Sequence, residues 1–133
     1  MASVKVYYQH RDGGDELVNF EREVKSHREL CEIFDNYPWE SELILSEQHG
    51  EGGGFFIVLG DEDDVYASYQ FVPMELHNGL LDIDIVAKPG FMRLLGRKSF
   101  STGLETVTLK DAKYKLKELF EHSVESLYRK YTK

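Results

Sequence analysis

The sequence has almost no cysteine and no long hydrophobic run. Its single cysteine, Cys31, excludes an internal disulfide and a cysteine-rich zinc site. No apolar stretch approaches the roughly 20 residues that a membrane span requires, so no membrane association is expected. The opening segment MASVKVYYQH alternates and lacks the apolar core of a signal peptide. Together these absences predict a cytoplasmic protein.

Signatures of catalysis are missing as well. The five histidines are scattered, and no two of them stand at the i, i+4 spacing of a helical metal site. No serine occupies a G-x-S-x-G elbow. In GFMRLLGRKS, residues 90–99, Arg97 interrupts the Gly-Lys pair that a phosphate-binding loop requires. We therefore assign no catalytic residue, no metal ligand and no cofactor, and we expect that the chain is not an enzyme.

The glycine-rich segment HGEGGG, residues 49–54, also suggests a phosphate loop at first sight. A phosphate loop follows a strand and precedes a helix. Here FFIVL, an apolar run typical of a strand, follows the glycines. The pattern predicts a flexible hairpin loop.

Negative charge is what the chain has in excess. Its 24 Asp and Glu outnumber 16 Lys and Arg, which gives a net charge of −8. Residues 1–92 hold 19 acidic and 6 basic residues, whereas residues 93–133 hold 5 and 10. An acidic surface repels nucleic-acid phosphates and attracts basic proteins, so we expect no direct nucleic-acid binding. The 133 residues suffice for one domain, residues 1–133, and the mixed charged surface predicts a monomer or a weak dimer.

Residue patterns in the first two thirds of the chain predict strands and one helix. SVKVYYQH and LVNFEREV flank RDGGD and predict a hairpin. A capping box at Ser26–Glu29 predicts a short helix that runs to about Asn36 and ends before Pro38. The runs ELILSE, FFIVLG, VYASYQFV and LLDIDIVA predict an antiparallel meander with one buried face. Within it, FFIVL is expected to be a central strand covered on both faces.

The C-terminal part predicts a helix that covers the sheet. KPGFMRLLGRKSFSTGLE has no clear period and predicts a long loop, or a loop with an edge strand. A second capping box at Thr108–Asp111 then begins a long helix, whose apolar face comprises Leu109, Ala112, Leu116, Leu119, Phe120, Leu127 and Tyr131. The predicted fold is therefore α+β: a mainly antiparallel sheet with an N-terminal hairpin, one short helix and one long C-terminal helix packed on the sheet.

Four consecutive carboxylates between two predicted strands are the most conspicuous feature of the sequence. In the strand that follows them, Tyr66 shares a face with Ser68 and Gln70, opposite the apolar residues. Acidic groups around an aromatic anchor suit a partner rich in Arg and Lys. A solvent-facing sheet side with one tyrosine explains the same pattern. The candidate partner-binding residues are Asp61, Glu62, Asp63, Asp64, Tyr66, Asp82, Asp84 and Trp39, of which Trp39 is alternatively a lid on the core.

Two other functions stay open at this point. A metal-dependent or small-molecule enzyme would use the clustered carboxylates, although DEDDVYASYQFV lacks the central glycine and alternate ligand spacing of a calcium loop. A generic regulatory module would instead bind through the basic residues Arg93, Arg97, Lys98 and Lys110 to Lys117.

The order of these segments resembles a family of bacterial immunity proteins. HRELCEIF, ELILSE, a glycine-rich turn, FFIVLGDEDDVYASYQFV, a variable loop and TVTLKDAKYKLKELFEHS carry the resemblance over about residues 26–123. Its clearest part is the strand-to-helix passage VTLKDA…ELF, and VKVYYQHRDGGDELV is similar to that family's N-terminal hairpin. The family is the first large α+β group of immunity proteins encoded beside polymorphic and contact-dependent growth-inhibition toxins. FMRLLGRKSFSTG departs from its pattern.

The resemblance implies a function without catalysis. Such a protein binds a cognate toxin domain in the cytosol of the producing cell and blocks its active site or substrate groove. These toxins are often nucleases or deaminases with basic nucleic-acid-binding surfaces, which an acidic inhibitor can occupy in place of phosphates. On that reading, the four carboxylates and Tyr66 face the partner.

Overall fold

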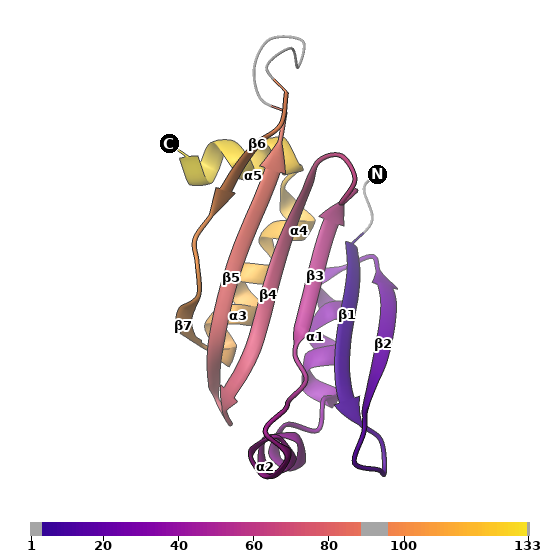
Figure 1. The fold of residues 1–133 in the computed structure, drawn as a ribbon. Helices are drawn as coiled ribbons and strands as arrows, with labels where there is room; N and C mark the ends of the chain where they lie inside the picture. Colours follow the sequence, from indigo (N-terminus) through magenta and orange to yellow (C-terminus); the bar gives the residue numbers. More distant parts are fainter. Residues whose placement is uncertain (1–3, 89–95, 133) are drawn as a thin grey trace.

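The fold is an antiparallel sheet with helices packed on one side (Figure 1). The computed structural model describes residues 4–88 and 96–132. Its strands are β1 Val4–Arg11, β2 Leu17–Val24, β3 Phe55–Gly60, β4 Tyr66–Glu75, β5 Asn78–Ala87, β6 Lys98–Ser101 and β7 Glu105–Thr108. Its helices are α1 His27–Asn36, α2 Trp39–His49, α3 Leu109–Leu116, α4 Glu118–Glu121 and α5 Val124–Thr132.

The strands form one sheet in the order β2-β1-β3-β4-β5-β6, and β7 pairs with β5 beside β6. Every pair is antiparallel. The N-terminal hairpin is confirmed as β1 and β2, and β6 supplies the expected edge strand. The α+β fold class with a mainly antiparallel sheet and a C-terminal helix on it is therefore confirmed. Part of the predicted loop, residues 89–95, lies outside the described residues.

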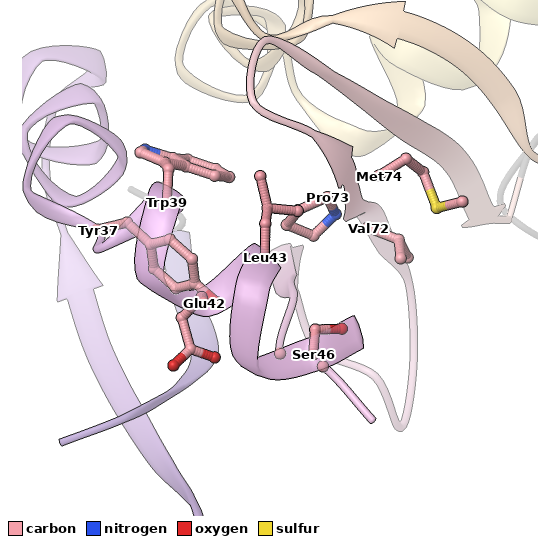
Figure 2. Close-up of a pocket in the computed structure, with 10 residues that line it drawn as sticks. Tyr37, Trp39, Glu42, Leu43, Ser46, Val72, Pro73 and Met74 are labelled. Atoms are coloured by element: carbon pink, nitrogen blue, oxygen red, sulfur yellow. The ribbon is translucent and has the colours of Figure 1, made fainter. Parts of the chain in front are cut away.

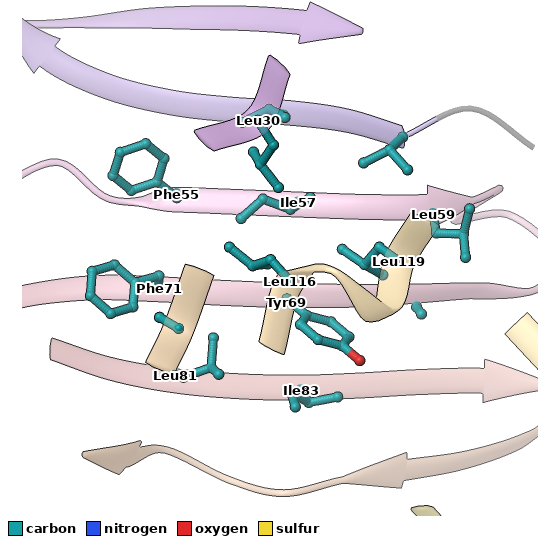
Figure 3. Close-up of a cluster of buried hydrophobic side chains, with 14 of the residues drawn as sticks. Leu30, Phe55, Ile57, Leu59, Tyr69, Phe71, Leu81, Ile83, Leu116 and Leu119 are labelled. Atoms are coloured by element: carbon teal, nitrogen blue, oxygen red, sulfur yellow. The ribbon is translucent and has the colours of Figure 1, made fainter. Parts of the chain in front are cut away.

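The core lies between the sheet and the helices (Figure 3). Leu30 from α1 and Leu116 and Leu119 from the C-terminal helices pack onto Ile57 and Tyr69 of the central strands. The alternation predicted for β5 is confirmed, because Leu81, Ile83, Ile85 and Ala87 are all buried while the aspartates between them are half-exposed.

The opposite side of the sheet carries no helix in the described part of the chain (Figure 1). The prediction that β3 is covered on both faces is therefore wrong, although its central position is confirmed. Val58, which points to this side, is nevertheless 3% exposed. It lies between Lys5 and Ser68 on the neighbouring strands, so adjacent side chains bury it.

ELILSE is not a strand but the middle of helix α2. The helix follows Pro38, carries Glu40 in its first turn and ends at Gly50, whose φ of 71° gives a left-handed C-cap. The connection from α2 to β3 is thus not a hairpin loop. Gly53 within it lies so close to β1 that a Cβ there would collide with the carbonyl oxygen of Gln9.

Both predicted capping boxes begin helices. Ser26 Oγ accepts a hydrogen bond from the Glu29 amide at 3.2 Å, and Thr108 Oγ1 accepts one from the Asp111 amide at 3.0 Å. The C-terminal helical region differs from one straight helix, because the backbone is extended at His122.

The interruption at His122 lets α5 fold back toward α4. Tyr131 Oη lies 2.5 Å from Glu118 Oε1, although the two residues are 13 positions apart. In a continuous helix that separation would span about 20 Å. The break therefore allows side chains of α5 to reach the buried carboxylate of α4.

Candidate protein-binding face

The four carboxylates form the tight turn between β3 and β4. Asp61 Oδ1 accepts a hydrogen bond from the Asp63 amide at 2.9 Å, and the Asp61 amide donates to the Val65 carbonyl at 2.9 Å. Gly60 enters the turn at a φ of 97°, a conformation that favours glycine. Asp61, Glu62 and Asp63 are exposed at this end of the sheet.

Two basic residues far along the chain contact this turn. Lys88 Nζ lies 2.6 Å from Asp64 Oδ1, and Arg97 Nη1 donates to the Asp64 carbonyl at 3.2 Å. The sequence cluster contains no basic residue, so this compensation was not expected. The negative charge that the turn presents to solvent is therefore carried by Asp61, Glu62 and Asp63.

Tyr66, Asp82 and Asp84 lie on the helix-free side of the sheet, as predicted. The register pairs Tyr66 with Val86, Ser68 with Asp84, and Gln70 with Asp82. These side chains therefore point the same way, and Tyr66 is half-buried beside the acidic turn. The pairing of β4 with β5, which is needed to bring Tyr66 near Asp82 and Asp84, is confirmed.

The same side holds further aromatic and acidic residues that the sequence reasoning missed. Tyr7 and Phe56 face each other across β1 and β3 with ring centroids 6.3 Å apart. Register pairs Glu21 with Tyr7 and Glu23 with Lys5, so β2 adds two exposed carboxylates. We call this surface the open face, defined by Tyr7, Glu21, Glu23, Phe56, Tyr66, Gln70, Asp82 and Asp84. Side-chain alternation along β1 and β3 predicts which residues share this face, but only once the pairing of the two strands is known.

One carboxylate of the open face changes the pKa of another. Partial burial and the neighbouring Asp84 carboxylate together raise the pKa of Asp82 above its ordinary value. Ser101 Oγ, which lies 3.4 Å from Asp82 Oδ1, acts in the opposite direction. The two neighbouring carboxylates repel each other, so a cation of the partner placed between them would be stabilised.

Trp39 does not belong to this face. Its Nε1 donates to the Phe34 carbonyl at 2.7 Å, and its ring lies 4.7 Å from Tyr37 and 5.5 Å from Phe55, centroid to centroid. Phe55 is the first residue of β3, whereas the acidic turn follows its last residue, Gly60. The structure thus places Tyr66 and the acidic turn at one end of the sheet and Trp39 at the other, as a lid on the core. Asp84 and Asp82 lie between these ends on the open face, in register with Ser68 and Gln70.

Two buried polar clusters were not foreseen, and neither has a local sequence signal. Arg11 Nη1 lies 3.1 Å from Glu42 Oε1, with both side chains almost fully buried, and Arg11 also donates to the carbonyls of Asp15 and Glu51. This pair ties the first hairpin to α2 and the glycine-rich connection. Its partners are 31 residues apart in the chain, so only the fold brings them together.

The second cluster surrounds Glu118. Tyr69 and Tyr131 donate to its Oε1 at 2.7 and 2.5 Å, and Lys130 donates to its Oε2 at 2.5 Å. Burial disfavours the charged carboxylate, but the three hydrogen bonds outweigh burial and lower the pKa of Glu118. The Tyr69 hydroxyl, buried against this carboxylate, has a strongly raised pKa. The cluster fixes α4 and α5 onto β4.

Other candidate chemistry has little geometric support. Among the described residues, no three His, Cys, Asp or Glu side chains are grouped to hold a metal ion. Burial raises the pKa of the Cys31 thiol, which makes it a poor nucleophile. On the basic side, Lys113 pairs with Asp35 at 2.6 Å and Lys117 with Glu121 at 3.8 Å. Arg93 lies outside the described residues.

Comparison with known proteins adds no assignment. No protein-family model matches the chain, and no match was found among curated proteins or among solved structures. Within residues 4–88 and 96–132, no helix is long and apolar enough to span a membrane.

Proposed function

We propose that this chain is an immunity protein that binds and neutralises a cognate bacterial toxin domain through its open face. The observation that carries the proposal is the combination of half-buried aromatic rings and carboxylates on a sheet side that no helix of residues 4–88 and 96–132 covers. The protein acts in the cytoplasm, has no catalytic activity of its own and binds neither nucleic acid nor membrane. Its partner is a basic nuclease or deaminase.

Physical chemistry gives the aromatic and acidic residues different tasks. Aromatic rings such as Tyr66 and Phe56 bury large area at low cost in conformational entropy, and they dominate binding energy at interface centres. The carboxylates around them steer a basic partner into place and can raise association to about 10⁸ M⁻¹s⁻¹ at low salt. An inhibitor that protects its own cell needs both fast capture and slow release.

The test is co-expression with the neighbouring open reading frames of its locus. The expected partner is a basic toxin domain that is lethal alone, harmless with this chain, and co-purifies with it in a stoichiometric complex. If no neighbouring product is toxic or bound, the proposal is wrong. A complex that forms but does not protect cells would make the chain a binding module of another kind.

A further inference from the structure

A second surface lies at the opposite end of the molecule from the acidic turn. Six large hydrophobic side chains are exposed among the described residues, and three of them, Ile44, Met74 and Leu76, lie around Trp39. Ile44 and Leu76 line a shallow depression with Trp39, and Met74 lines a cavity with it. Single exposed apolar residues are ordinary, but a contiguous patch marks an interaction site.

The cavity beside Trp39 has the size of one bulky side chain. Figure 2 shows Trp39 and Leu43 on α2 opposite Pro73 on β4. The cavity volume is about 180 Å³, and its lining is mixed, because Glu42 and Ser46 lie beside the apolar side chains. A cavity of about 150 Å³ is large enough to hold benzene. A leucine or an aromatic ring fits. The glycine-rich connection keeps the cavity open on one side, since Gly52 and Gly53 line it without side chains.

Carboxylates outnumber cations around this patch. No Lys or Arg lines the cavity or the depression among the described residues, and Lys110 follows Leu109, whose amide donates to the His77 carbonyl at 2.7 Å next to Leu76. Glu40 lies in the depression beside Trp39, Glu75 stands between Met74 and Leu76, and Glu47 is exposed on the same helix. No Lys or Arg occurs anywhere between Glu29 and Ala87. A second copy of this chain placed on the patch by a two-fold axis would bring two surfaces rich in carboxylates together, which disfavours self-association.

We propose that the Trp39 patch, defined by Trp39, Leu43, Ile44, Met74 and Leu76, binds a short amphipathic segment of another protein. One bulky apolar side chain of that segment enters the cavity, and Lys or Arg residues beside it pair with Glu40 and Glu75. The segment occupies a different surface from the open face. The inference therefore does not depend on the immunity function.

Trp39 is the only tryptophan of the chain, so its fluorescence reports on this patch directly. The probe is a synthetic peptide with leucines at helical spacing and lysines on the opposite face. We expect a saturable change in Trp39 emission on titration. A peptide in which glutamate replaces lysine should leave the emission unchanged.

Matched variants separate apolar docking from simple charge attraction. Ile44→Glu with Leu76→Glu should weaken peptide binding by about tenfold or more. Leu104→Glu with Tyr114→Glu adds the same charge at residues that are 59% and 70% exposed elsewhere, and should bind no more weakly than the unaltered chain. Because both variants are more acidic, attraction of the lysines alone would strengthen in each. Equal binding by the two variants, or an unresponsive Trp39, would overturn the proposal.

The oligomeric state tests whether a second copy of this chain, and not another protein, occupies the Trp39 patch. Sedimentation velocity should give the same monomeric species for the unaltered chain and for Ile44→Glu with Leu76→Glu. A dimer that this pair of substitutions dissociates would assign the patch to a second copy and overturn the proposal. Unchanged thermal unfolding midpoints for both variants are expected, because all four substituted side chains are exposed.

Discussion

At the scale of single residues, the buried pair of Arg11 and Glu42 is the most consequential contact for stability. Its side chains are 2% and 6% exposed, so each charge depends on the other and on the carbonyls of Asp15 and Glu51. Removal of one partner leaves a charge buried without its counterion, which costs more than removal of both.

We therefore expect Glu42→Leu to lower the free energy of unfolding by about 3–5 kcal/mol. Arg11→Met combined with Glu42→Leu should cost less than Glu42→Leu alone. Urea unfolding of both variants measures the difference. Glu32→Leu, which removes an exposed partner of Arg28, is the control and should change stability by less than about 1 kcal/mol. A double variant less stable than Glu42→Leu would show that the pair is not a simple charge balance.

Glu118 predicts a specific dependence of stability on pH. Since its folded pKa lies below the ordinary value of 4.5, its ionised form stabilises the fold at neutral pH. This contribution is lost as pH falls from 4.5 through the lower folded pKa. Glu118→Gln should cost about 2 kcal/mol at pH 7, because hydrogen bonds to a charged group are replaced by neutral ones.

The gap between the unaltered chain and Glu118→Gln should narrow in acid, as followed by thermal unfolding between pH 7 and pH 3. Glu121→Gln is a matched control, because its side chain is 53% exposed and its partner Lys117 is equally accessible. A gap that stays constant over this range would show that size or shape, and not charge, accounts for the effect.

At the scale of elements, the sequence correctly predicted those strands and helices whose buried residues recur at a regular spacing. The alternation of LLDIDIVA defined both faces of β5, and the serine and threonine caps located the starts of α1 and α3. Helix α2 escaped prediction because Leu43, Ile44 and Leu45 are consecutive, and Ile44 is 53% exposed. Its helical signals were the flanking Pro38 and Gly50 and the acidic residues Glu40 and Glu42 of the first turn.

For the candidate site, too, only the part that follows from regular spacing was predictable from the sequence. Tyr66, Asp82 and Asp84 share a face because side chains alternate along paired strands. The contact of Lys88 with Asp64 and the separation of Trp39 from the acidic turn depend on where loops and helices pack. Periodicity along the chain carries no such information. The break at His122 likewise brings together Glu118 and Tyr131, which are 13 positions apart in the chain.

The connection between α2 and β3 offers a test at this scale. We expect Gly53→Ala to destabilise the fold by about 2 kcal/mol or more, because the new Cβ would collide with the Gln9 carbonyl of β1. Gly14→Ala is the control, since nothing lies within 4 Å of its added Cβ, and it should be neutral or stabilise by up to about 1 kcal/mol. Chemical denaturation measures both. Equal stability of the two variants would mean that the connection shifts away from β1 without cost.

At the scale of the whole molecule, the open face and helix α3 carry charge of opposite sign. The open face carries Glu21, Glu23, Asp82 and Asp84, while α3 on the other side carries Lys110, Lys113 and Lys115 beside Asp111. A basic partner is therefore attracted to the open face and repelled by α3.

Association with the partner should therefore depend on which acidic residues are reversed. Asp63→Lys with Asp84→Lys should slow association by about tenfold at low salt, with little change at high salt. Glu32→Lys with Glu121→Lys changes the net charge equally on the helix side and should have a much smaller effect. Stopped-flow mixing with the proposed toxin domain measures both rates. If the two variants slow association equally, net charge and not the open face steers the encounter.

The lysines of α3 have a practical consequence for such experiments. Reagents that acylate amines will attach more often to the helix side than to the open face. Of the nine lysines among the described residues, five lie in or between the C-terminal helices, whereas Lys5 lies beside the open face and Lys88 pairs with the acidic turn. A sensor surface coupled through amines would therefore hold most molecules by their helices, with the open face turned toward the solution. The protein can therefore be immobilised through its lysines and still bind a partner through the open face in the same assay.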